Sequence, residues 1–236
     1  MIKDGNVRVT LLSLVQPHLL PRHEKAPIAV FLSGHVDSVK QGGVPPQLRR
    51  MTVRVNKHGS LRTAGLPVCD IGEIQPSSTE RAVQNCGDAI VGSGQFWAHI
   101  VLPGQPPYAT HGRLLVFNGR KKGRRVILAH IYTANPFPTS FVIPFTIDNV
   151  KGGPYGTKLN ASFPSALGDW GFVDRIKLTL RRKWTKHGKQ FSYFNANCPA
   201  LPGTRAASFP LAQADFAFGG KALSLEVHKS CGVLGK

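Results

Sequence analysis

The sequence predicts an all-β protein: an antiparallel β-sandwich of two sheets, with about 11 strands and one short helix. Short apolar runs recur along the 236 residues, and several alternate between apolar and polar side chains, as half-buried strands do. Gly (25 residues) and Pro (18 residues) separate these runs at short intervals. Such closely spaced strands favour antiparallel pairing over alternating strand–helix units.

Eleven segments have the composition and the flanking turn residues of strands. In 174–181, cationic and hydroxyl side chains alternate with aliphatic ones, so one face of this strand is cationic. Residues 50–56 alternate in the same way and place Arg50 and Arg54 on the polar face. The candidates are 28–36, 50–56, 94–103, 112–118, 124–132, 140–147, 156–164, 172–182, 190–198, 213–219 and 222–230.

One segment, SSTERAVQNCG (77–87), has the signals of a helix. Ser77 followed three residues later by Glu80 is the pattern of a capping box. Gly87 fits the position just beyond the last helical turn. We therefore predict a short helix near 78–86.

Residues 27–236 are expected to form a single β-sandwich domain, because composition does not change sharply along them. A Gly-rich stretch at 148–156 is the best candidate for a hinge. Residues 1–26 are predicted to be an N-terminal extension, disordered or loosely attached. Their apolar run is interrupted by polar residues, and no A-x-A cleavage site follows, so no export signal is recognisable.

The four cysteines, Cys69, Cys86, Cys198 and Cys231, are widely and irregularly spaced. This spacing predicts two disulfides rather than a metal site, and we expect neither a metal nor a cofactor. Three connectivities are possible, of which the sequence-local one is the simplest. Reduced cysteines in the core are the alternative. Disulfides would imply an oxidising compartment, and hence an extracellular or cell-envelope location.

The chain carries a net charge of +18, and its middle part, 113–189, holds 15 Lys or Arg residues against 3 acidic ones. Such an excess favours an anionic polymer or surface as a non-specific partner. Two Gly-containing turns, 120–125 and 181–189, hold most of these cations, and solubility or edge protection is the alternative role for them. The predicted contact residues are Arg120, Lys121, Lys122, Arg124, Arg125, Arg175, Lys177, Arg181, Arg182, Lys183, Trp184, Lys186 and Lys189.

Trp184 can stack on a base or a sugar ring. The sequence has no RNA-recognition, zinc-finger or helix-turn-helix motif, so we expect no sequence-specific nucleic-acid binding. No uninterrupted apolar run reaches the length of about 18 residues typical of a transmembrane helix.

A hydrolase acting on a cell-wall glycan or polysaccharide is one alternative function. It needs two carboxylates at a defined separation, and the candidates in the second half of the chain are few. They are Asp148, Asp169, Asp174, Asp215 and Glu226. A structural module that pairs through exposed strands is a second alternative.

Several segments resemble a group of exported bacterial β-rich proteins of unknown function that carry paired cysteines. The resemblance runs from about residue 27 to residue 233, and it implies export and disulfides but no activity. It rests on HGRLLVFNGR (111–120), FVIPFTI (141–147), YGTKLNASFP (155–164), GFVDRIKLTL (171–180) and SYFNANCPA (192–200). We therefore expect a non-catalytic, exported or envelope-associated protein whose basic face binds an anionic polymer or surface.

Overall fold

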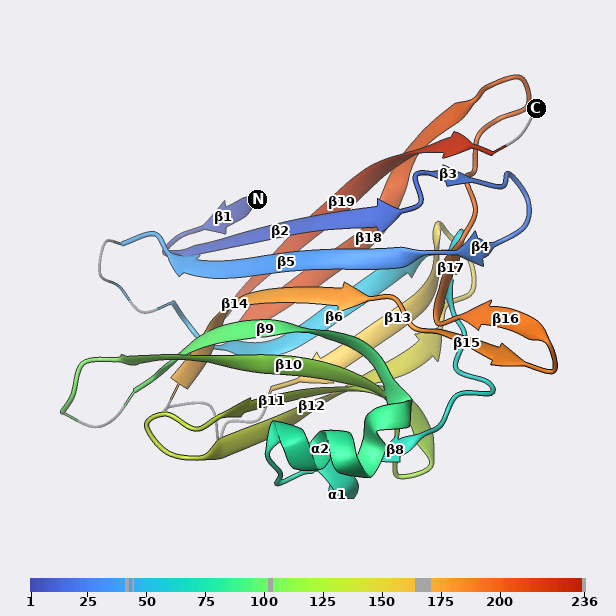
Figure 1. Cartoon of the computed structure of the whole chain (residues 1–236). Coiled ribbons are helices and arrows are strands. Elements are labelled where there is room, and N and C mark those ends of the chain that lie inside the picture. The colour runs from blue at the N-terminus through green and yellow to red at the C-terminus, as the bar shows by residue number, and fades with distance from the viewer. Residues whose placement is uncertain (41–42, 44, 102–103, 164–170, 235–236) are drawn as a thin grey trace.

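The computed structural model describes residues 1–40, 43, 45–101, 104–163 and 171–234, apart from the side chain of Lys189. The chain is built mainly of β-strands, as the sequence predicts (Figure 1). The main sheet runs in the order β1 (Ile2–Asp4), β2 (Val7–Gln16), β5 (Ala29–Ser38), β14 (Gly171–Leu180), β9 (Ile90–Ile100), β10 (Tyr108–Lys121), β11 (Arg124–Thr133), β12 (Thr139–Asn149), β13 (Tyr155–Ser162), β6 (Leu48–Asn56), β18 (Ala206–Phe218), β19 (Lys221–Val233) and β3 (Leu19–Leu20).

Two small sheets and one short strand accompany the main sheet. A hairpin joins β15 (Lys183–Lys186) to β16 (Lys189–Ser192), and β17 (Phe194–Ala196) lies between β4 (Ala26–Pro27) and β7 (Gly59–Leu61). Strand β8 (Cys69–Asp70) pairs in parallel with β10.

The expected sandwich of two separate sheets is not what the described strands form. Most of them belong to one curled sheet (Figure 1), which is continuous because β14 pairs with β5 on one side and with β9 on the other. This pairing joins the N-terminal strands to the middle of the chain. The curl brings the first strands back against the last ones, so that Val7 and Val9 share a core cluster with Phe216 and Leu223. Sequence spacing predicts the strands, but it does not reveal such non-consecutive neighbours.

Residues 1–26, expected to be an extension, contribute four strands of the structure. Strand β2 pairs with β5 over ten residues. Its inward residues are apolar except for Ser13, and Val7 and Val9 are completely or almost completely buried. The stretch 148–156, expected to be a hinge, forms the turn between β12 and β13. A backbone hydrogen bond from Val150 N–H to the Gly156 carbonyl closes this turn at 3.0 Å.

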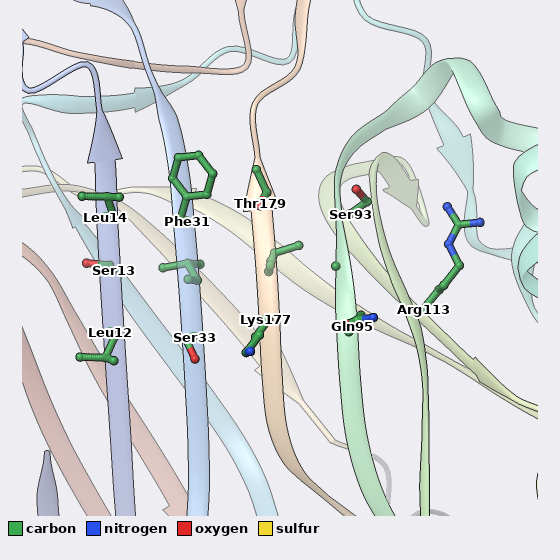
Figure 2. A pocket seen from close by; sticks show the side chains of 13 residues that line it. Leu12, Ser13, Leu14, Phe31, Ser33, Ser93, Gln95, Arg113, Lys177 and Thr179 are labelled. Carbon is green, nitrogen blue, oxygen red and sulfur yellow. The ribbon is translucent and has the colours of Figure 1, made fainter.

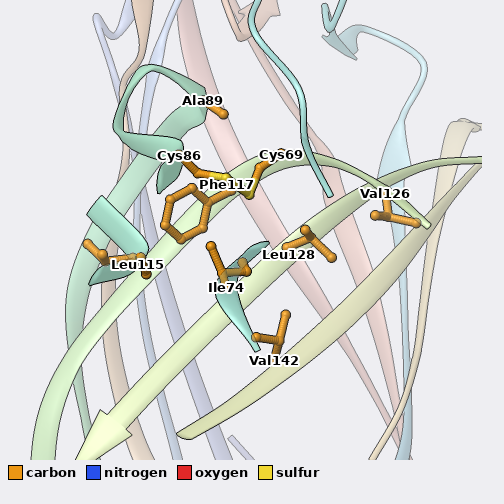
Figure 3. Packing of buried hydrophobic residues seen from close by; sticks show 10 residues of the cluster. Cys69, Ile74, Cys86, Ala89, Leu115, Phe117, Val126, Leu128 and Val142 are labelled. Atoms are coloured by element: carbon orange, nitrogen blue, oxygen red, sulfur yellow. A yellow bond between two sulfur atoms is a disulfide. The ribbon is translucent and has the colours of Figure 1, made fainter. Parts of the chain in front are cut away.

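The curled sheet has two faces. The outer face is the one that α1 (Ile71–Ile74) and α2 (Thr79–Cys86) cover, and the inner face is the face on the opposite side, inside the curl. Along β10, Leu115 and Phe117 pack against the helices, and the alternate residues Leu114 and Val116 belong to the inner clusters. Figure 3 shows Phe117 at the centre of the cluster beneath the helices. The helices thereby divide the outer face into two exposed parts.

The predicted helix is confirmed as α2, but Ser78 rather than Ser77 is its N-cap. The Ser78 side chain accepts a hydrogen bond from the Arg81 N–H at 3.3 Å, which satisfies one of the free donors of the first turn. The capping-box arrangement occurs one element earlier, between Asp70 and Glu73 of α1. Helix α1 is only four residues long and was not predicted.

The cysteines form two disulfides, Cys69–Cys86 and Cys198–Cys231. This is the sequence-local connectivity. The first bond ties β8 to the end of α2 and packs beside Phe117 (Figure 3). The second ties the segment after β17 to the end of β19, in a cluster that includes Leu20 and Ile28.

His130, on β11, is completely buried beneath the helices, and its Nε2 lies 3.1 Å from the Ser77 carbonyl oxygen. Desolvation by burial lowers its pKa, although the contact with Ser77 opposes this shift. The unfolded chain therefore binds a proton more readily than the folded one. The free energy of unfolding should fall as the pH drops below about 6.5.

Replacing His130 with Gln, which can still donate to the Ser77 carbonyl, should reduce this loss of stability at acidic pH. Urea denaturation at about pH 7.5 and about pH 5 would measure the difference for both proteins. If the two proteins lost equal stability between these pH values, His130 would not be the group responsible.

Candidate polyanion-binding groove

A groove with a volume of about 990 Å³ lies on the outer face beside α1. It is formed by the β10–β11 hairpin and by the strands β12, β13 and β6 that follow it in the sheet. Among the residues that the structure describes, five cationic side chains border it and no acidic side chain does. The groove residues are Arg50, Ile71, Gln75, Lys121, Lys122, Arg124, Val126, Val142, Pro144, Thr146, Lys158, Asn160 and Ser162.

The β10–β11 hairpin supplies three of the five cations. Strand β10 ends at Lys121 and β11 begins at Arg124, directly opposite it. The turn is therefore only Lys122–Gly123, shorter than the sequence predicts. Both turn residues have positive φ, 48° for Lys122 and 75° for Gly123, as a type I′ turn requires. This tight turn projects Lys121 and Arg124 onto the outer face together.

The other two cations, Arg50 and Lys158, come from β6 and β13. Because these strands pair antiparallel, with Arg50 opposite Ser162 and Arg54 opposite Lys158, their polar faces share the outer surface. Arg54 is neutralised by Asp215 on the neighbouring strand β18. No carboxylate among the described residues forms an ion pair with Arg50 or Lys158.

Polar side chains keep the groove floor ordered. The Asn160 amide donates to Asp148 at 3.0 Å, and its carbonyl oxygen accepts from the Thr52 hydroxyl at 3.0 Å. The apolar part of the floor continues into the cluster beneath the helices, which includes Val126 and Val142. The disulfide and α1 therefore support one wall of the groove.

The two predicted basic turns lie at the same end of the curled sheet (Figure 1). The chain between β7 and β8 connects them, because Arg125 donates to the Thr63 hydroxyl at 3.0 Å and Gly65 lies against Trp184 and Lys186. The second turn is also a tight hairpin, with positive φ at His187 and Gly188. Sequence patterns predicted the β10–β11 hairpin. They predicted 181–189 as a turn between strands 172–182 and 190–198, whereas the hairpin forms between β15 and β16 inside this range.

The remaining predicted contact residues are dispersed. Arg120 and Arg181 are exposed at the two turns, Arg182 donates to the Asp88 carbonyl at 3.3 Å, and Lys183 lines a separate hollow. The side chain of Lys189 lies outside the described part. Trp184 is half-buried, with its ring centroid 5.9 Å from that of Phe191, so much of its surface is already covered.

Arg175 and Lys177 do not line the groove and lie on β14, which β9 separates from β10 in the sheet. They occupy the other exposed part of the outer face. Conversely, Arg50 and Lys158 were not predicted as contact residues. The alternation of polar and apolar side chains in 50–56 and 156–162 was visible in the sequence, but the pairing of β6 with β13 was not.

The candidate catalytic carboxylates are engaged by neighbouring side chains. Asp215 accepts from Arg54 and from the Ser224 hydroxyl, and Asp174 lies 3.5 Å from His99 Nδ1. Asp169 lies outside the described residues.

Glu226 accepts from the Tyr155 hydroxyl at 2.6 Å and lies 2.7 Å from His228 Nε2. Hydrogen bonds from Tyr155 and then His228 lower the Glu226 pKa, whereas a general acid of a glycosidase needs a raised one. The same contact, after desolvation, raises the pKa of Tyr155 to about 12. The lowered pKa does not suit Glu226 to the role of a general acid.

One group of potential metal ligands occurs among the described residues, formed by Cys69, Glu73 and Cys86. Its two sulfur atoms are bonded to each other, so they do not serve as thiolate ligands.

No described helix is long and apolar enough to cross a membrane. Comparison with known proteins gave no family model, curated protein or solved structure that matches this chain. The function must therefore be argued from the groove itself.

Proposed function

We propose that this chain is a non-catalytic, exported or envelope-associated protein that binds an anionic polymer or surface in the groove beside α1. The observation that carries the proposal is the set of five cations on the groove lining, which includes no acidic side chain among its described residues. The two disulfides are consistent with an extracellular location, as is the resemblance to exported proteins.

The groove suits an extended anion better than a single small one. Its cations come from two distant parts of the chain, the β10–β11 turn and the paired strands β6 and β13. Lys121, Lys122 and Arg124 are exposed, so they keep their hydration until a ligand arrives. Binding would neutralise several ligand charges and release their counterions, and affinity would fall steeply with salt.

Lysine reactivity provides a direct test of the binding site. With long-chain inorganic polyphosphate as the probe, Lys121, Lys122 and Lys158 should acetylate more slowly than in the free protein. Lys3 and Lys40, which are exposed elsewhere, should react at unchanged rates and serve as internal controls. Mass spectrometry after brief acetylation at low salt measures all five.

Equal protection of all five lysines would show that polyphosphate coats the protein through its net charge alone. Protection confined to Lys183 and Lys186 would place the site on the second basic turn instead. Either result would contradict the proposal.

A further inference from the structure

The second exposed part of the outer face holds a different arrangement of side chains. Trp97 on β9 lies directly opposite Arg175 on β14 in the strand register. The Arg175 guanidinium carbon and the Lys177 ammonium nitrogen each lie 5.7 Å from the indole ring centroid. Arg175 and Lys177 are exposed, whereas Trp97 is half-buried. Two cations therefore flank one aromatic ring on an open surface.

Neither cation has a carboxylate partner among the described residues. Two acidic side chains of β5 and β14 lie within ion-pair distance of histidines instead. Asp37 lies 2.8 Å from His35 Nε2, and Asp174 lies 3.5 Å from His99 Nδ1. The charges on Arg175 and Lys177 are thus available to a ligand.

A shallow hollow of about 560 Å³ begins one row of side chains away from Trp97, at Gln95 and Lys177. Its central row crosses the sheet through Ser33, Lys177, Gln95 and Arg113, which the register places opposite one another. Neighbouring strands are about 4.8 Å apart, so this row presents hydrogen-bonding groups at close and regular intervals. Arg113 also attracts Glu80 of α2 and is less free than Lys177.

The next row adds the hydroxyl groups of Ser93 and Thr179, together with Phe31. Leu12 and Leu14 of β2 close the hollow, and their side chains are 65% and 49% exposed. The surface therefore combines an aromatic ring, unpaired cations, neutral hydrogen-bonding groups and a modest apolar border. The side chains that line the hollow come from β2, β5, β14, β9 and β10, which are neighbours in the sheet (Figure 2).

We propose that this surface is a second site, which binds an acidic polysaccharide whose sugar rings carry carboxylate or sulfate groups. The C–H groups on one face of a sugar ring would pack on Trp97, and the carboxylate or sulfate of that sugar would pair with Arg175 or Lys177. The adjoining sugar would lie in the hollow, where its hydroxyl groups meet Gln95, Ser33 and Thr179. This inference rests on the proposed function only in assuming an anionic ligand. The site and its residues are separate from the groove.

A single-stranded nucleic acid is less well matched to this surface. Such ligands are held by successive aromatic rings on which consecutive bases stack. Here one indole is followed by hydroxyl and amide side chains, which suit the many hydroxyl groups of a sugar polymer. The geometry thus favours a glycan over an oligonucleotide.

Saturation-transfer NMR with a galacturonate hexamer tests the proposal. The sugar ring protons should receive saturation from the wild-type protein, and Trp97→Ala should abolish most of this transfer and weaken binding about tenfold or more. Phe137→Ala removes an exposed aromatic ring elsewhere and should leave the transfer unchanged. Arg175→Gln with Lys177→Gln should weaken binding while leaving the indole in place.

Two control ligands make the result decisive. A neutral maltohexaose should bind more weakly than the acidic hexamer, and so should an oligothymidylate of the same length. The inference would be overturned if either control ligand bound as tightly as the acidic hexamer or more tightly. It would also be overturned if the hexamer bound Trp97→Ala and the Arg175→Gln, Lys177→Gln variant with unchanged affinity. Lysine protection by polyphosphate in the groove is measured separately, so failure of this second site would leave the proposed function standing, and failure of the groove would leave this site intact.

Discussion

Replacing Cys198 and Cys231 together with Ala should lower the free energy of unfolding by about 3 to 4 kcal/mol. The bond closes a segment with a sequence separation of 33, so its loss increases the conformational freedom of the unfolded chain. Both cysteines are buried, 0% and 4% exposed, in the cluster that joins the end of β19 to the N-terminal strands. Their removal should therefore also loosen this junction.

Urea denaturation of the oxidised proteins measures the effect, with the Cys69→Ala and Cys86→Ala pair as comparison. That bond spans a sequence separation of 17 and should contribute about 3 kcal/mol, slightly less than the longer loop. A loss below about 1 kcal/mol for the Cys198–Cys231 pair would mean that the junction is held by packing alone.

Reversing three groove charges, with Lys121→Glu, Arg124→Glu and Lys158→Glu in one protein, should weaken polyphosphate binding about 100-fold at about 0.1 M salt. Each lost cation removes the release of roughly 0.7 counterions, and three such losses amount to about two orders of magnitude at this ionic strength. Repulsion by the new carboxylates adds to the effect. These side chains are exposed or half-buried, so the fold should tolerate the changes.

The matched control reverses three exposed cations outside the groove, with Lys3→Glu, Lys40→Glu and Arg205→Glu. Both variants have the same net charge, six units below the wild type. The control should bind polyphosphate with only a small loss, because distant charges are screened beyond about 10 Å at this salt concentration.

Local features of this fold could be predicted from the sequence. The Lys122–Gly123 and His187–Gly188 turns are short because Gly accepts positive φ, and the flanking runs alternate with period two. The disulfides follow the simplest pairing because each joins cysteines that are close in the chain. Local spacing carries this information, so the β10–β11 hairpin and two disulfides were predicted, with the observed pairing as the simplest of three. The separate β15–β16 hairpin was not predicted.

Contacts between distant segments could not be predicted in this way. Whether β14 lies between β5 and β9, and whether β6 lies beside β13, depends on pairing between segments far apart in the chain. Arg50 joins Lys121 in the groove, and Arg175 meets Trp97, only through these pairings. The sequence therefore predicted cations on turns and on one strand face, but not the two surfaces that they form.

The dependence of polyphosphate affinity on salt tests the central claim most directly. The logarithm of the association constant should fall linearly with the logarithm of salt concentration for the wild type. The slope should be shallower by about two for the groove variant, because it makes three fewer cation–phosphate contacts, and nearly unchanged for the control variant of equal net charge. Equal slopes and equal affinities in the two variants would contradict the account, because net charge and not the groove would then govern binding.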